Sequence, residues 1–199
     1  KMMFEHTKSV RMGVKKSLLV IDLPYNTYRN KSEALKNSKK AIKETKCDAV
    51  KIEGGSRVKD IVSHLVKNKI PVLGHIGITP QTTKGKFKSK GKTETEKKKL
   101  IYDAKVLEQS GAFGIVLECI YSDISKKITN LIKIPTIGIG ASIHCDGQVL
   151  VTDDILGLTN AKIKFVKKYT NIKKIINSAV FKFKQEVKSK KYPTKKYSY

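Results

Sequence analysis

Cysteine is scarce in this sequence of 199 residues, and long apolar runs are absent. The three cysteines, Cys47, Cys119 and Cys145, lie far apart and form no CxxC pair, which is typical of a reduced, cytoplasmic protein. No run approaches the roughly 18 apolar residues that a membrane-spanning helix requires. The first residues, Lys1–His6, contain no apolar segment of a secretory signal. We therefore expect a cytoplasmic protein with no membrane partner and no disulfide scaffold.

Arginine is also scarce, although the chain carries a net charge of +25 from 42 basic and 17 acidic residues. The arginines are Arg11, Arg29 and Arg57, and all other basic residues are lysines. A basic surplus can indicate binding to nucleic acid. Bidentate contacts to phosphate and guanine favour arginine, however, so this composition argues against nucleic acid as the main partner.

Short runs of Val, Ile and Leu alternate with stretches whose apolar residues have the spacing of one helix face. The runs fit strands that are buried on both faces. Alternating strands and helices predict a parallel sheet, either closed as a (β/α)8 TIM barrel or open as a doubly wound sheet. About six of the eight βα units of a barrel are visible. The expected strands are Ser17–Ile21, Ala49–Ile52, Ile70–Leu73, Phe113–Leu117, Ile134–Ile139 and Val149–Val151.

Helix starts and irregular segments can also be predicted. Thr93 and Glu96 have the spacing of a capping box, and Ser122 and Asn171 are candidate N-caps. The Lys-, Gly- and Thr-rich segment Thr79–Thr93 predicts a loop. We expect one domain over residues 1–199, ending in a helix and a basic, extended tail from Lys188 to Tyr199.

Ionisable residues follow four of the expected strands: Asp22, Glu53, His75 and Glu118. The carboxyl ends of parallel barrel strands share one face, so these side chains are expected to converge. Three carboxylates would repel one another unless a cation lay among them, which suggests Mg²⁺. Lys51 precedes Glu53 by two residues and should point the same way, toward an anionic partner such as a substrate carboxylate.

Each of these residues taken singly also has an ordinary structural interpretation. Asp22 could be a turn residue, and Glu53 could lie exposed in a loop. His75 could be a core histidine, Lys51 could reach solvent, and Glu118 could pair with a lysine. The single residues leave these alternatives open.

The order of six segments resembles the ketopantoate hydroxymethyltransferase family. The resemblance runs from His6 to near the end of the chain and is specific because the segments occur in the same order and at similar spacing. The segments are Asp22–Tyr25, Val50–Gly55, Gly74–Gln81, Leu117–Cys119, Ile137–Gly140 and Asp146–Val151.

The resemblance implies roles for the polar residues. Asp22 would be a metal ligand that also contacts substrate, and Glu53 would lie in the same Mg²⁺ site. Lys51 and His75 would contact substrate, and Glu118 would be the general base or acid. The family transfers a hydroxymethyl group from 5,10-methylenetetrahydrofolate to 3-methyl-2-oxobutanoate through a metal-stabilised enolate. It also implies a homo-oligomer.

Two other functions remain possible from the sequence. One is another Mg²⁺-dependent barrel enzyme that handles 2-oxo acids, of the phosphoenolpyruvate mutase and isocitrate lyase type. The other is a non-catalytic, lysine-rich binding homologue. We also expect the first two strands of the barrel, with the Asp-Ser pair that the family carries there, to lie upstream of Lys1, and residues 1–199 alone to be inactive.

Overall fold

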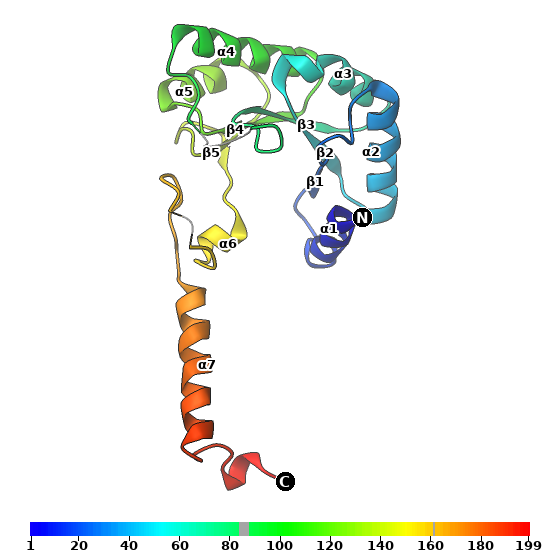
Figure 1. Ribbon diagram of the computed structural model, residues 1–199. Helices are drawn as coiled ribbons and strands as arrows, with labels where there is room; N and C mark the ends of the chain where they lie inside the picture. Colours follow the sequence, from blue (N-terminus) through cyan, green and yellow to red (C-terminus); the bar gives the residue numbers. More distant parts are fainter. Residues whose placement is uncertain (84–87, 161) are drawn as a thin grey trace. The chain divides into compact units, whose positions relative to one another are not determined.

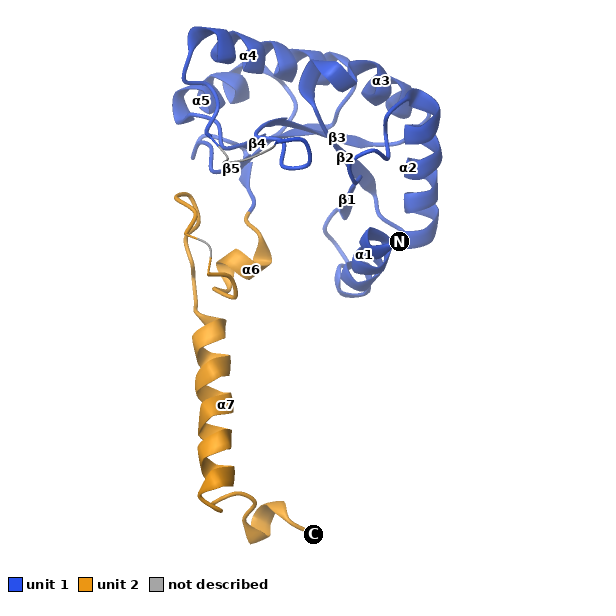
Figure 2. Ribbon diagram, viewed as in Figure 1, with its two compact units in different colours: residues 1–149 blue, residues 150–199 orange. Residues whose placement is uncertain are grey.

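The computed structural model describes residues 1–83, 88–160 and 162–199. The chain forms two compact units, Lys1–Val149 and Leu150–Tyr199 (Figure 2), and each is described by itself. The expectation of a single domain stays a prediction. Part of the loop expected over Thr79–Thr93, residues 84–87, lies outside the described residues.

The first unit is built on a six-stranded parallel sheet whose strands follow one another in chain order. Each strand pairs only with its sequence neighbours and the helices lie in the connections, which is the arrangement of consecutive βα units of a barrel. The predicted α/β fold with about six of eight barrel units is confirmed. The strands are β1 (Val20–Asp22), β2 (Ala49–Glu53), β3 (Val72–Gly77), β4 (Gly114–Glu118), β5 (Thr136–Ile139) and β6 (Gly147–Gln148).

The helices of this unit follow the outer side of the curved sheet (Figure 1). The capping box that starts α4 is present, with the Thr93 hydroxyl accepting from the Glu96 backbone N–H. The predicted cap at Ser122 is wrong, because Ser122 is the first helical residue and its hydroxyl donates to Ser142. The helices are α1 (Met2–Gly13), α2 (Lys31–Thr45), α3 (Lys59–Lys67), α4 (Glu94–Gln109) and α5 (Ser122–Leu131), with a 3₁₀ turn at Gly55–Val58.

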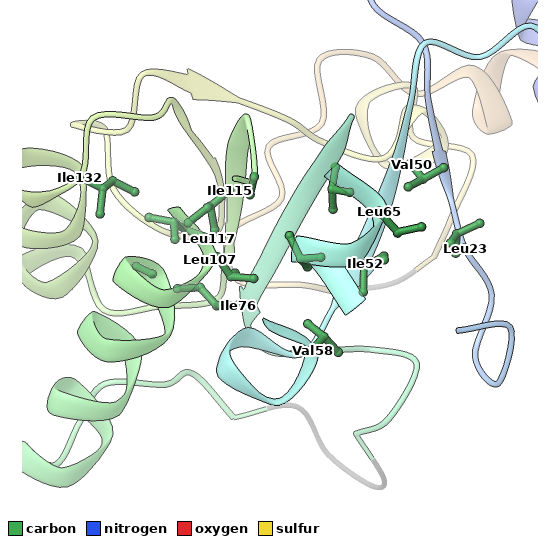
Figure 3. Close-up of a cluster of buried hydrophobic side chains, with 14 of the residues drawn as sticks. Leu23, Val50, Ile52, Val58, Leu65, Ile76, Leu107, Ile115, Leu117 and Ile132 are labelled. Carbon is green, nitrogen blue, oxygen red and sulfur yellow. The ribbon is translucent and has the colours of Figure 1, made fainter. Parts of the chain in front are cut away.

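The hydrophobic core lies between the sheet and these helices (Figure 3). Ile52, Ile115 and Leu117 from the strands meet Leu65 of α3 and Leu107 of α4, and all five side chains are fully buried. Side chains alternate along a strand, so the residues between these core positions, including Lys51 and His75, point to the other face of the sheet.

Four strands differ from the expectation. β1 begins at Val20 instead of Ser17 and includes Asp22, and β5 begins at Thr136 instead of Ile134. β3 extends to Gly77, so His75 lies inside the strand instead of after it. The segment Gly74–Gly77 contains two glycines and a histidine, and it therefore has no apolar pattern that would predict a strand. The last strand is Gly147–Gln148, before the predicted Val149–Val151.

The second unit contains α6 (Thr152–Ile155), α7 (Ile172–Lys188) and a 3₁₀ turn at Lys195–Tyr197. Asn171 caps α7 as predicted, because its side chain accepts from the Lys174 backbone N–H. No residue of α7, all of which the structure describes, is buried. In the described parts of the chain, no helix has both the length and the apolar character needed to cross a bilayer.

Candidate active site

Alternation along β2 determines which side chains face the interior of the curved sheet. Val50 and Ile52 are fully buried in the core against the helices. Lys51 and Glu53 therefore point to the opposite face, and both point the same way, as the spacing predicts.

The same reasoning orients β3 and β4. A Cβ atom added at Gly74 would meet Leu107 of α4, so this position faces the helices and His75 faces the interior. In β4, Leu117 is fully buried in the core, and Glu118 lies on the other face.

Strand register then brings the polar residues together. Asp22 pairs with Lys51 across β1 and β2, and Glu53 pairs with His75 across β2 and β3. Glu118 pairs with Gly77, two residues beyond His75 and on the same face. The five predicted residues thus lie on adjacent strands near their carboxyl ends.

A continuous series of contacts connects four of them. The Lys51 Nζ atom lies 2.8 Å from Asp22 Oδ1 and 3.1 Å from His75 Nδ1. His75 Nε2 lies 3.2 Å from Glu118 Oε2. A lysine ammonium can only donate, so His75 Nδ1 accepts and the ring proton belongs on Nε2, toward Glu118.

Glu53 is the most deeply buried carboxylate of the group, with 3% of its side chain exposed. Its Oε1 lies 3.8 Å from His75 Nδ1, and its Oε2 accepts from the Gln81 backbone N–H at 3.2 Å. Burial raises the pKa of Glu53 above its usual value, although His75, Lys51 and the Gln81 N–H act in the opposite direction. The neighbouring groups thus compensate the buried charge only in part.

The donor set of the site fits Mg²⁺. Among the described residues, no group of three or more His, Cys, Asp or Glu is placed to hold a metal ion. Mg²⁺ is commonly held by one or two carboxylates, and water and substrate complete its ligands. Asp22 and the under-compensated, buried Glu53 supply two hard oxygen donors of this kind.

The loop after β2 is held by α4. The Asp103 carboxylate accepts from the Ser56 backbone N–H at 2.7 Å and from Lys99 Nζ at 2.6 Å. It packs so closely on Gly55, at φ +59°, that an added Cβ would lie 2.5 Å from Asp103 Cγ. These contacts of Asp103 hold the backbone that directly follows Glu53 in one position.

A hollow of about 460 Å³ lies beside this loop. Its walls come from the residues after β2, the end of β3 and the start of α4. The Lys99 ammonium is paired with Asp103. Residues that line the hollow include Gly54, Gly55, Arg57, Gly77, Thr79 and Lys90.

Two residues beside the site were not assigned a role from the sequence. Gln81 contacts the ends of β1 and β2, and its position in the segment Gly74–Gln81 was the only signal available. Tyr28 is half-buried near Glu53 and Asp22, and burial together with these carboxylates raises its pKa to about 12. Its phenol is therefore neutral at physiological pH.

Comparison with known proteins identifies the relatives of the chain. The sequence profile described as ketopantoate hydroxymethyltransferase matches residues 1–195. A Pelagibacter ubique protein named 3-methyl-2-oxobutanoate hydroxymethyltransferase is 60% identical over 100% of this chain and 77% of its own length. A Clostridium botulinum protein of the same name is 47% identical over 99% of this chain and 73% of its own length.

Solved structures agree on the fold alone. A Burkholderia cenocepacia protein described as a phosphonomutase superimposes with a TM-score of 0.51 at 10% identity. The match covers 69% of this chain and 60% of that protein. The family profile and the relatives, together with the fold and the convergent polar residues, show that the chain belongs to the ketopantoate hydroxymethyltransferase family.

Proposed function

We propose that the protein transfers a hydroxymethyl group from 5,10-methylenetetrahydrofolate to 3-methyl-2-oxobutanoate, giving 2-dehydropantoate for pantothenate synthesis. Membership of the family supports the transferase activity. The observation that carries the chemistry is the series Asp22–Lys51–His75–Glu118 beside the buried Glu53. It places a cation, a histidine and three carboxylates on one face at the strand ends.

Lys51 and His75 bind and orient the oxo acid in this proposal. The Lys51 ammonium is largely buried, with 17% of its side chain exposed, and can pair with the substrate carboxylate. The His75 Nε2 atom lies 3.2 Å from Glu118 Oε2 but makes no hydrogen bond to the described residues, so its proton can be donated to a substrate oxygen. The two contacts hold the acid with its C3 hydrogen in a fixed direction.

Glu118 takes the proton from C3. Its carboxylate lies at the end of β4 with 17% of its side chain exposed, so it is accessible to substrate yet shielded from most solvent. A base must come within hydrogen-bond reach of the proton that it removes, and the contact with His75 directs Glu118 toward the site.

Asp22 and Glu53 would hold Mg²⁺, which when bound supplies positive charge that stabilises the negative charge developing on the substrate oxygens. The C3 carbon attacks the methylene carbon of the folate. Both C–N bonds of that methylene carbon break, one as the C–C bond forms and the other as water supplies the hydroxyl group, and the two folate nitrogens take up the protons from C3 and from water. The hollow beside the loop after β2 is lined by Glu96 and Asp103 as well as by Arg57 and Lys90, and by none of the five candidate site residues, so it does not locate the folate.

An assay of the purified complete enzyme, with the two upstream barrel strands present, tests this function. We expect Mg²⁺-dependent formation of 2-dehydropantoate that requires both the folate and the oxo acid. Turnover of another 2-oxo acid without folate would favour an enzyme of the phosphoenolpyruvate mutase and isocitrate lyase type. Salt-sensitive binding of nucleic acid without turnover would favour a non-catalytic binding protein.

Replacing Glu53 with Gln should stabilise the protein when no divalent cation is present. The pKa of Glu53 is raised in the folded state, so the folded state loses stability as pH rises from the unfolded pKa through the folded one. At pH 8 in EDTA, Glu53→Gln should have a higher Tm than the wild type. At pH 4 the difference should vanish, and Mg²⁺ should raise the Tm of the wild type alone. Differential scanning calorimetry measures the Tm of both proteins under each of these conditions.

Glu44→Gln, on the exposed side of α2, is the matched control and should leave Tm unchanged at both pH values. If Glu53→Gln has a lower Tm than the wild type at pH 8 in EDTA, the negative charge of Glu53 is fully compensated by neighbouring groups of the protein. That result would remove the argument for a cation at this carboxylate.

We also propose that the protein is a cytoplasmic homo-oligomer. Within the second unit taken by itself, the side chains of Ile175, Val180 and Phe181 in α7 are exposed. A second copy of the chain could cover them. Light scattering after size exclusion should show an oligomer that dissociates in Val180→Glu and persists in Lys182→Glu. A wild-type monomer would contradict the proposal.

A further inference from the structure

Gln81 connects the ends of two strands that carry the candidate metal ligands. Its side-chain Nε2 donates to the Leu23 carbonyl oxygen at 3.1 Å, and its backbone N–H donates to Glu53 Oε2 at 3.2 Å. Leu23 directly follows Asp22. Gln81, in the loop that follows β3, therefore contacts both the backbone beside Asp22 at the end of β1 and the carboxylate of Glu53 at the end of β2.

The orientation of the Gln81 amide follows from its partner. A carbonyl oxygen can only accept, so the nitrogen of the amide must face Leu23 and Oε1 must face the other way. The Oε1 atom is buried and accepts no hydrogen bond from the described residues. A buried acceptor is costly to leave unsatisfied.

The contacts of Gln81 bear on the two carboxylates in different ways. The N–H to Glu53 orients a buried side chain directly. The amide contact to Leu23 restrains the backbone next to Asp22, whose own carboxylate is paired with Lys51. Because both contacts come from one residue, the loop after β3 couples the positions of Asp22 and Glu53.

We propose that Gln81 is a positioning residue that holds Asp22 and Glu53 at the separation at which both can reach one divalent cation. The inference rests on the proposed function, since it assigns both carboxylates to the metal. Residues that orient metal ligands through hydrogen bonds typically change metal affinity by about 10–100-fold when they are replaced. A residue that only fastened a loop would change thermal stability instead.

Binding of Mn²⁺ to the purified complete enzyme tests the inference, with electron paramagnetic resonance reporting the free ion. Gln81→Met keeps the length of the side chain and removes the amide. It should weaken Mn²⁺ binding by about 10–100-fold. Gln109→Met, on the exposed end of α4, is the matched control and should bind Mn²⁺ as the wild type does. Both variants should keep Tm close to that of the wild type.

Proton exchange at C3 of 3-methyl-2-oxobutanoate gives a second readout. In Gln81→Met, the Mg²⁺ concentration for half-maximal exchange should rise by the same factor as the Mn²⁺ dissociation constant. The exchange rate at saturating Mg²⁺ should stay within about threefold of the wild type, because Gln81 does not touch the proton that moves. A loss of stability alone would not raise the Mg²⁺ concentration for half-maximal exchange while leaving the exchange rate at saturating Mg²⁺ unchanged.

Each outcome decides the inference. If the wild type binds Mn²⁺ and Gln81→Met binds it within about twofold, the role of Gln81 is overturned and the proposed function stands. If the wild type binds no Mn²⁺, the metal part of the proposed function fails and the inference fails with it. Should Gln81→Met not fold, Gln81→Asn decides. It keeps an amide that is one methylene too short to hold the contact, so unchanged Mn²⁺ binding would overturn the inference.

Discussion

Replacing Glu118 with Gln should slow proton exchange at C3 of 3-methyl-2-oxobutanoate by roughly two to four orders of magnitude, the range for loss of one general base. The substitution preserves the shape of the side chain and removes its ability to take a proton. Glu118 lies at the end of β4, 3.2 Å from His75 Nε2, on the face that also carries Lys51. NMR in D₂O with Mg²⁺ and without folate isolates this step from the transfer that follows.

Binding of the oxo acid should change little in the same variant. Lys51 and His75, which are proposed to hold the acid, keep their own contact at 3.1 Å. Glu44→Gln is the control and should exchange at the wild-type rate. Exchange within about threefold of the wild type in Glu118→Gln would assign the base to another group. Glu53 would then be the next candidate, because burial raises its pKa toward the range of a useful base.

The positions of the strands could be predicted because buried parallel strands are short runs of Val, Ile and Leu. β2 and β4 begin within one residue of the predicted runs and end one residue beyond them. The extension of β3 to Gly77 could not be predicted in this way. Its last residues are fixed by pairing with β4 from Leu73 to Gly77, a tertiary interaction that leaves no apolar pattern.

The candidate site, like the strands, could be predicted where chain position determines it and not where tertiary contacts do. Asp22, Glu53 and Glu118 end their strands, so chain position alone placed them on one face. The roles of these residues stay predictions. Gln81 could not be assigned, because its contact with Leu23 joins residues 58 positions apart and depends on a side-chain amide in a loop. Periodicity carries no information about such a contact.

The position of Lys51 also shows what the sequence leaves open. Alternation predicted that Lys51 and Glu53 share a face, and the structure confirms it. The sequence suggested a substrate carboxylate as the partner of Lys51. In the structure the ammonium instead contacts Asp22 and His75. A bound acid would therefore join or replace a contact that already compensates the charge of Lys51.

The contact between Asp22 and Lys51 gives two interpretations of Asp22 that can be separated. As a metal ligand, Asp22 supplies a hard oxygen donor to Mg²⁺. As a structural residue, it neutralises Lys51 at 2.8 Å or shapes the turn before Pro24. The aspartate is 39% exposed at its side chain, more than Glu53 or Glu118, so a ligand can reach it.

Asp22→Ala should raise the Mg²⁺ concentration for half-maximal C3 exchange by roughly two orders of magnitude or more, because one direct ligand is lost and Mg²⁺ accepts few protein ligands. Asp22→Asn keeps one neutral oxygen donor and should fall between Asp22→Ala and the wild type, whereas a turn residue would tolerate Asn fully. Asp60→Ala, on the exposed side of α3, should behave as the wild type. Exchange titrated with Mg²⁺ measures all four proteins, and near-normal Mg²⁺ dependence in Asp22→Ala would show that Asp22 is not a ligand.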